Sequence, residues 1–215
     1  YFSVELNKEI EISNKKIGDK HKSFIIAEIG INHNGSFEIA KKLILEAKKA
    51  GCDAIKFQSF LSDFRVSKKV KSERYVEKVI DTEESINQLF KKVELTFDEQ
   101  KKLFKFAKTN KILMFSTPFD FESADFLEYL GVDLYKIASM DLTNMPLVEH
   151  VAKKMKPVII STGMSKLHEI DETVEAFKST GNPNLIILHC NSSYPTPLKD
   201  VNLNAMQKIG HVFDR

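Results

Sequence analysis

Six short apolar runs, separated by segments with helical periodicity, constrain the fold of this chain most strongly. Apolar runs of this length between turn residues are typical of buried strands, and repeated strand–helix units indicate a parallel sheet covered by helices. The six expected strands are residues 24–30, 54–60, 112–119, 133–139, 158–163 and 185–191. The sequence therefore predicts an α/β fold.

Polar residues lie at the carboxyl end of each expected strand. In a parallel α/β barrel the catalytic groups sit at these strand ends, and side chains alternate between the two faces of a strand. The side chains expected to point inward at this end are those of Glu28, Lys56, Gln58, Thr117, Lys136, Ser161, His189 and Asn191. Two lysines and one carboxylate among neutral hydrogen-bonding groups favour an anionic substrate.

Two architectures accommodate this pattern. A TIM (β/α)8-type barrel would use its strand ends as a ring, but eight strands typically need about 250 residues. We therefore expect about six of the eight βα units in this chain, as a partial barrel over residues 23–215 that follows an N-terminal hairpin or extension at 1–22. The alternative is a six-stranded doubly wound sheet, in which the polar residues would line one crevice.

Helix start and stop signals lie between the strands. Ser36 is a predicted N-cap, Gly51 occupies a predicted C′ position, and Thr96 with Glu99 is a predicted capping box. Helices are expected at 83–92, 97–109, 123–130, 146–154, 166–179 and 202–215. The stretch 60–80 has no clear period and is expected to be an exposed excursion.

Composition excludes several classes of partner. Apolar residues make up 42% of the chain and charged residues 29%, as in an ordinary globular protein, and the net charge is only +2. Neither nucleic acid nor a membrane is therefore an expected partner, and no apolar stretch approaches a membrane span in length. With two cysteines and no signal-peptide pattern at its start, the chain is expected to be cytoplasmic.

Six strand-end motifs, in order along the chain, resemble the sialic acid synthase family. They are AEIGINHNG at 27–35, KFQ at 56–58, FSTPF at 115–119, YKIAS at 135–139, STGM at 161–164 and HCNSSYPTP at 189–197. The resemblance implies condensation of phosphoenolpyruvate with an N-acylated hexosamine aldehyde such as N-acetylmannosamine, with release of phosphate, to give a nonulosonic acid.

The same resemblance implies roles for individual residues. Lys56 and Lys136 would bind the anionic groups of phosphoenolpyruvate, as point charges suited to phosphate. Glu28 would be the sugar-side carboxylate, and it would act in proton transfer or orient a hydroxyl, while an internal ion pair with a lysine is also expected. Further substrate contacts would come from Gln58, Thr117, Phe119, Ser139, Ser161, Gly163, Asn191, Ser192 and Tyr194.

Asp141 is the departure from the family pattern. The family usually carries glutamate at this position, so the acid is kept here with one methylene fewer. We expect Asp141 to act at the aldehyde end of the site, with a sugar specificity that does not transfer directly from the family.

The resemblance also implies a divalent metal, Mn or Mg, that polarises the aldehyde as a Lewis acid. The family's ligands lie on the last two barrel strands, so no ligand is assigned in this chain. In the family, an antifreeze-like C-terminal domain completes the site across a homodimer. This domain is also expected to be absent here, and this chain alone is expected to be inactive. We expect His33 to be a turn element and His189 to be a hydrogen-bonded histidine of the barrel.

Two alternatives remain open from the sequence. The first is a Schiff-base pyruvate aldolase with Lys136 as the nucleophile. The second is a non-catalytic, sugar-binding barrel relic. His189 and Cys190 do not form a nucleophile–base pair, because adjacent strand residues face opposite ways.

Overall fold

The computed structural model describes residues 3–67 and 85–214. Contacts along the chain divide it into two compact units, which we call unit 1 (Tyr1–Ser23 with Val132–Arg215) and unit 2 (Phe24–Gly131). Each unit contains three parallel strands in chain order with helices between them. The predicted α/β class with parallel strands is therefore confirmed, while the predicted partial barrel over 23–215 stays a prediction.

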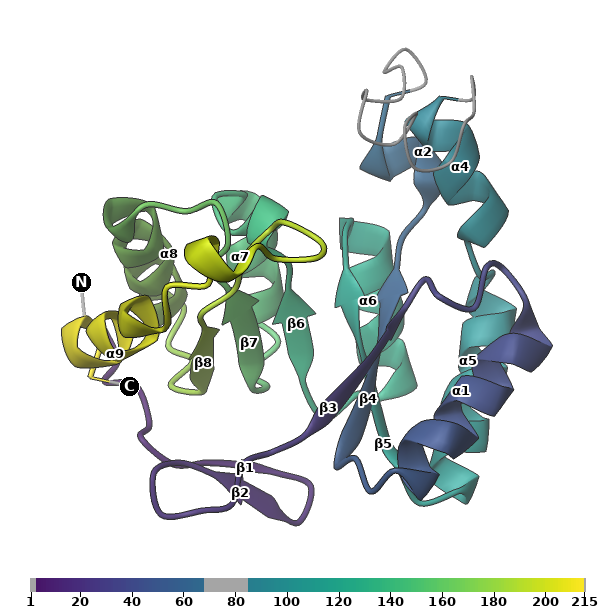
Figure 1. Ribbon diagram of the computed structural model, residues 1–215, viewed down its shortest axis with the longest axis horizontal. Coiled ribbons are helices and arrows are strands. Elements are labelled where there is room, and N and C mark those ends of the chain that lie inside the picture. The colour runs from purple at the N-terminus through teal and green to yellow at the C-terminus, as the bar shows by residue number, and fades with distance from the viewer. Residues whose placement is uncertain (1–2, 68–84, 215) are drawn as a thin grey trace. The chain divides into compact units, whose positions relative to one another are not determined.

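In unit 2, β4 pairs in parallel with β3 and with β5 (Figure 1). The strands are β3 (Ile26–Gly30), β4 (Ala54–Ser59) and β5 (Leu113–Pro118). The helices are α1 (Phe37–Lys49), α2 (Ser62–Arg65), α4 (Ile86–Val93), α5 (Phe97–Thr109) and α6 (Phe121–Leu130). Helices α1 and α5 pack against each other and against the strands, and α2 packs against α4.

The predicted caps of unit 2 are confirmed. The Ser36 side chain accepts a hydrogen bond from the backbone N–H of Ile39 at the start of α1, and Gly51 after its end has a φ of +81°. At the start of α5 the Thr96 hydroxyl accepts from the Glu99 N–H, while the Glu99 carboxylate accepts from the Thr96 N–H at 2.9 Å. These bonds satisfy donors that a helix N-terminus leaves without intrahelical partners.

Three expectations for unit 2 need adjustment. The helix expected at 123–130 begins at Phe121, because Asp120 is the N-cap and accepts from the Ser123 N–H at 2.7 Å. Of the excursion expected at 60–80, residues 62–65 form α2, while 68–80 lie outside the described residues. The helix expected at 83–92 begins at Ile86 with Ser85 as its cap, and residues 83–84 also lie outside the description.

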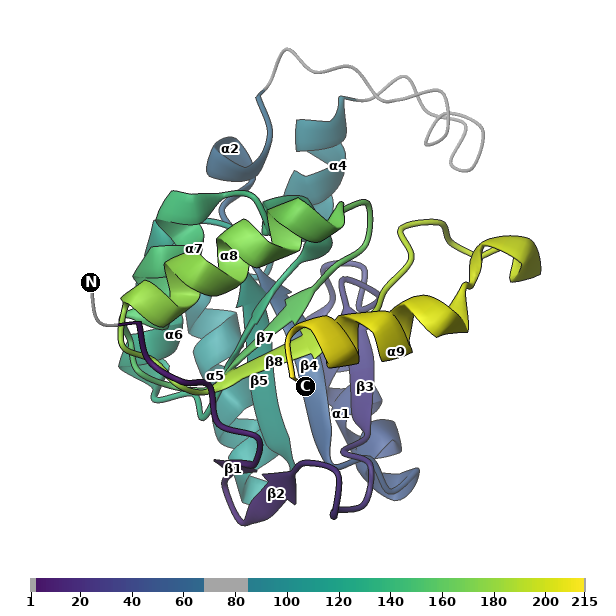
Figure 2. The same cartoon turned by 90° about the vertical axis from the view of Figure 1, so that its left-hand side faces the viewer.

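In unit 1, β7 pairs in parallel with both β6 and β8, and the predicted N-terminal hairpin is antiparallel. The strands are β1 (Ile10–Ile12), β2 (Lys15–Ile17), β6 (Tyr135–Ile137), β7 (Val158–Ser161) and β8 (Leu185–Leu188). The helices are α7 (Met145–Ala152), α8 (Leu167–Ser179) and α9 (Leu203–Val212). Helices α7 and α8 pack side by side (Figure 2).

Apolar side chains from these helices and strands are buried in each unit. In unit 1, Val151 of α7, Phe177 of α8 and Ile160 of β7 are each fully buried. In unit 2, the buried cluster includes Ile44 of α1 and Leu103 of α5. Burial of this kind supplies most of the stability of a globular unit and holds the carboxyl ends of the strands in place. Within the described parts of the chain, every helix is too short or too polar to span a bilayer.

Candidate functional site

The predicted site residues lie at the carboxyl ends of strands in both units. Unit 2 carries Glu28, Lys56, Gln58, Thr117 and Phe119. Unit 1 carries Lys136, Ser139, Asp141, Ser161, Gly163, Asn191, Ser192 and Tyr194. Each group forms its own set of contacts.

A buried lysine lies at the centre of the unit 2 group. Lys56 is only 8% exposed, and its Nζ lies 2.6 Å from Glu28 Oε2 and 3.2 Å from Thr117 Oγ1. The parallel register places Glu28 beside Lys56 on the neighbouring strand, so the pair follows from strand pairing. The internal ion pair expected as one role of Glu28 is confirmed. The Glu28 side chain is nevertheless about half exposed, at 54%, so it remains accessible to a ligand.

Close packing around Gly30 brings the ends of two site residues together. A Cβ atom on Gly30 would lie 2.9 Å from Glu28 Oε1 and 3.5 Å from Gln58 Nε2. The residue has a φ of +54°, which an L side chain rarely adopts. The Glu28 carboxylate and the Gln58 amide therefore lie next to the same point of the backbone. The carboxylate can accept hydrogen bonds there, and the amide nitrogen can donate them.

Sequence reasoning missed Arg65, which lies against two of the predicted residues. Its Nη1 donates to Gln58 Oε1 at 3.1 Å, and its guanidinium carbon lies 3.7 Å from the centroid of the Phe119 ring. Arg65 lies in the stretch without helical or strand period, so no periodic pattern identified it. The one available signal was an arginine close in sequence to KFQ and two phenylalanines.

Lys136 lies at the centre of the unit 1 group and is 7% exposed. Its Nζ donates to Ser161 Oγ and, at 2.9 Å, to the backbone carbonyl of Ile137. The two residues come from neighbouring strands, because β6 pairs with β7.

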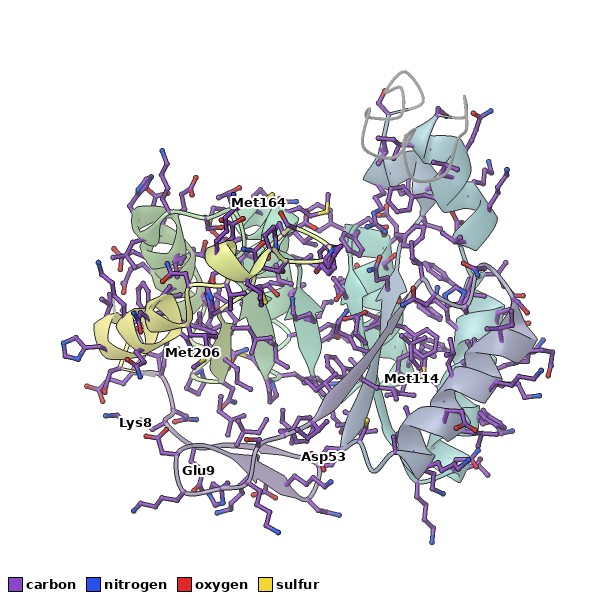
Figure 3. All side chains as sticks on the ribbon, viewed as in Figure 1. Lys8, Glu9, Asp53, Met114, Met164 and Met206 are labelled. Carbon is purple, nitrogen blue, oxygen red and sulfur yellow. The ribbon has the colours of Figure 1, made fainter. Side chains whose placement is uncertain are left out.

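Hydroxyl groups surround Gly163, two residues after the end of β7. Its N–H donates to Ser139 Oγ at 3.0 Å, and a Cβ atom on it would lie 2.6 Å from Ser192 Oγ and 2.9 Å from Ser139 Oγ. The next residue, Met164, is labelled in Figure 3 and has a 73% exposed side chain. Only glycine lets both hydroxyls approach the backbone here, and the structure thereby brings Ser139, Gly163 and Ser192 together.

The remaining predicted residues of unit 1 lie around this cluster. Asp141 ends a 3₁₀ turn that follows β6, and its Oδ2 is buried. Asn191 donates from Nδ2 to the Asp200 carbonyl at 3.0 Å and accepts from the Ser193 N–H at 2.9 Å, so its amide holds the loop. The sequence left Asn191 and Ser192 undistinguished, and the structure favours Ser192 as the polar group at the cluster. Tyr194 is 79% exposed.

The two histidines behave as expected. His189 Nε2 lies 2.9 Å from the carbonyl of Val201, which confirms a hydrogen-bonded histidine. His33 is 1% exposed, accepts at Nδ1 from the Gly35 N–H at 3.1 Å and stacks on Phe57. Burial lowers the pKa of His33 below its usual 6.5, which favours the neutral ring.

A metal does not fit the described part of the chain. Among residues 3–67 and 85–214, no three histidine, cysteine, aspartate or glutamate side chains are grouped so that they could hold a metal ion. We therefore derive no chemical step through a metal from these residues.

Comparison with known proteins identifies the family of the chain. The NeuB family profile matches residues 43–215. The N,N'-diacetyllegionaminic acid synthase of Campylobacter jejuni is 43% identical over 194 residues, which cover 89% of this chain and 58% of the relative. The N-acetylneuraminate-9-phosphate synthase of Homo sapiens is 32% identical over 197 residues, which cover 92% of this chain and 54% of the relative.

A solved structure supports the same relationship. The crystal structure of the N-acetylneuraminic acid (sialic acid) synthetase from Leptospira borgpetersenii superposes with a TM-score of 0.82 at 36% identity, over 95% of this chain and 67% of that one. This chain spans little more than half the length of the two curated relatives, at 58% and 54%.

Proposed function

The chain belongs to the NeuB family, and from this we propose that the protein that carries it is a nonulosonic acid synthase. The proposed reaction condenses phosphoenolpyruvate with an N-acylated hexosamine aldehyde and releases inorganic phosphate. Relatives that are 33 to 43% identical to this chain over the aligned residues are named as N,N'-diacetyllegionaminic acid synthase, pseudaminic acid synthase and N-acetylneuraminate-9-phosphate synthase. N-acetylmannosamine and its diacetamido analogues are therefore the sugars to test.

The hydroxyl cluster of unit 1 supports the proposal most directly. The buried amine of Lys136 lies against the Ser161 hydroxyl, and the hydroxyls of Ser139 and Ser192 converge on Gly163. Phosphate and carboxylate oxygens accept hydrogen bonds, and a cation with several donors is the set that binds them. Five residues predicted to contact substrate thus form two sets of contacts within one unit. In unit 2, Lys56 is proposed to bind phosphoenolpyruvate as well.

The proposed chemistry balances without a covalent enzyme intermediate. The electrons of the enol double bond form a bond from C3 of phosphoenolpyruvate to the aldehyde carbon, and the aldehyde oxygen takes a proton. Water then adds to C2, and cleavage of the C2–oxygen bond releases phosphate and leaves a ketone. Glu28, held by Lys56 and half exposed, is proposed to assist proton transfer at the sugar, and Asp141 to act at the aldehyde end.

The larger architecture is part of the proposal. The parallel strands of each unit, linked by helices, support six βα units of a TIM-type barrel. The superposition on the sialic acid synthetase covers 95% of this chain, which supports the same architecture. We further propose a cytoplasmic homodimer that requires a divalent metal, Mn or Mg. The alternative of a sugar-binding relic is disfavoured because unit 1 keeps a buried lysine together with several hydroxyl groups.

Phosphate release tests the proposal on the protein that carries this chain. With phosphoenolpyruvate, an acylated hexosamine and a divalent metal, we expect phosphate release that depends on the sugar. Sugar-independent release, or none with any of the acylated hexosamines, would contradict the proposal. Borohydride with pyruvate tests the aldolase alternative, which requires a neutral Lys136 amine. We expect no trapped adduct, because the Lys136 Nζ is buried and bonded to the Ser161 hydroxyl and the Ile137 carbonyl.

A further inference from the structure

Arg65 lies inside a cage of three aromatic rings in unit 2. Its guanidinium carbon lies 3.7 Å from the ring centroid of Phe119, 3.9 Å from that of Phe90 and 4.6 Å from that of Phe60. Phe60 meets Phe90 and Phe119 edge-on, with centroids 5.5 and 6.3 Å apart. Aromatic faces attract a guanidinium, so three rings hold this cation in one place.

The backbone that carries Arg65 is also held from several sides. Asn87 on α4 donates from Nδ2 to the carbonyl of Ser62 at 2.9 Å and to that of Val66 at 3.1 Å. Glu94 accepts from the Ser62 N–H at 2.8 Å. These bonds hold both ends of α2, which Figure 1 shows beside α4. Arg65 is thus positioned by the unit itself before any ligand binds.

The contact between Arg65 and Gln58 determines how the amide is oriented. A guanidinium has five donors and no acceptor, so the Gln58 oxygen must face Arg65 at 3.1 Å. The amide nitrogen then faces the opposite way, toward the point beside Gly30 where the Glu28 carboxylate also lies. Gln58 therefore presents donors beside an acceptor.

We propose that Arg65 is a positioning residue that makes Gln58 a hydrogen-bond donor to the sugar substrate. With the amide held in this orientation, Gln58 binds a carbonyl or hydroxyl oxygen of the acylated hexosamine, while Glu28 accepts from a hydroxyl. A substrate group that offers only hydrogen-bond donors to Gln58 is rejected, because the Gln58 amide nitrogen is itself a donor. The inference rests on the proposed function, since it assigns Gln58 to the sugar.

Calorimetric titration of the protein that carries this chain tests the inference, with phosphoenolpyruvate and the best-binding acylated hexosamine as separate probes. Arg65→Met keeps a flexible apolar side chain among the rings but loses the bond to Gln58. We expect its affinity for the sugar to fall about five- to tenfold, and its affinity for phosphoenolpyruvate to stay within about twofold. Lys102→Met, which removes an exposed cation paired with Asp98 in the same unit, is the matched control and should leave both affinities unchanged.

A double-mutant cycle separates positioning from a general structural role. If Arg65 acts through the amide, Arg65→Met added to Gln58→Ala causes no further loss of sugar affinity. Gln58→Glu keeps the bond to Arg65, but its carboxylate has no N–H to donate. We therefore expect this variant to lose sugar affinity as Arg65→Met does, while its melting temperature stays that of wild type. Additive losses in the cycle, or a Gln58→Glu variant that binds sugar as tightly as wild type, would overturn the inference.

Two further outcomes are decisive. If Arg65→Met fails to fold, Arg65→Lys replaces it, because an ammonium cannot both lie among the rings and reach Gln58. Unchanged sugar affinity in a folded Arg65→Lys would then overturn the inference. If wild type itself binds neither probe, the proposed function fails, which is a different result from wild-type binding that Arg65 variants leave unchanged.

Discussion

Gly163 shows how one residue without a side chain assembles a cluster of hydroxyl groups. Its hydrogen substituent lets the hydroxyls of Ser139 and Ser192 approach the backbone from two sides. The same pattern applies in unit 2, where Gly30 admits the ends of Glu28 and Gln58. In both places the glycine controls the distance between polar groups that come from separate elements.

We expect Gly163→Ala to weaken phosphoenolpyruvate binding while the protein stays folded. The added methyl group would lie under 3 Å from both hydroxyls, and these short side chains can rotate away, so the cost falls on the cluster rather than on the core. Loss of one or two hydrogen bonds to a charged ligand corresponds to a roughly tenfold or greater drop in affinity, measured by calorimetry. On a Ser192→Ala background the same change should cost less, because one clashing hydroxyl is gone. Equal cost on both backgrounds would show that the crowding at Gly163 does not act through Ser192.

Residue types and strand periodicity were enough to predict most of the charged groups at the strand ends. Lys56 and Glu28 were predicted to share a face, and their pairing follows from register. Arg65 could not be predicted, because Phe90 and Phe119, two of its three aromatic neighbours, lie far from it in sequence and its own segment has no period. Asn191 and Ser192 could not be separated either, because only the loop's folded path shows which side chain holds the backbone.

At the scale of elements, the helix caps show why boundaries are harder to predict than the elements themselves. The capping boxes at Ser85 and Thr96 each join an N-cap residue to the residue three positions later, and the sequence alone predicted the one at Thr96. The start of α6 was placed too late, because Asp120 has two uses: it caps the helix and its Oδ2 accepts from the Leu61 N–H at 2.8 Å. The local sequence around an N-cap residue does not show that the same side chain also bonds a distant loop.

We expect Thr96→Ala to lower the free energy of unfolding by about 1 kcal/mol, because α5 loses the hydroxyl that accepts from the Glu99 N–H. Urea titration followed by circular dichroism measures this change. Thr109→Ala at the other end of the same helix is the control, since its hydroxyl bonds only a carbonyl within the last turn. A Thr96→Ala effect no larger than that of Thr109→Ala would contradict the capping role.

For the whole molecule, the buried neutral His33 predicts how stability depends on pH. Its pKa in the folded chain lies below 6.5, its usual value, because burial disfavours the charged ring. Between these two values the unfolded chain binds a proton that the folded chain does not, so the free energy of unfolding rises with pH across this window and falls as the solution is acidified below about 6.5.

Denaturant titrations at a series of pH values between about 5 and 7.5 test this dependence. We expect His33→Phe, which keeps a ring against Phe57, to show a shallower loss of stability on acidification than wild type. His168→Phe, at an exposed position, controls for the removal of a histidine. If wild type and His33→Phe lose stability in parallel, His33 does not remain neutral in the folded chain.

The central claim is that the strand ends of this chain bind phosphoenolpyruvate through Lys56 and Lys136, and calorimetric titration of that ligand tests it most directly. We expect wild-type protein to bind, and Lys56→Met and Lys136→Met each to bind about ten- to a hundredfold more weakly, with sugar affinity unchanged in Lys136→Met. Lys153→Met, which removes an exposed lysine paired with Glu149, should bind like wild type. Wild-type affinity for phosphoenolpyruvate in both buried-lysine variants would contradict the account.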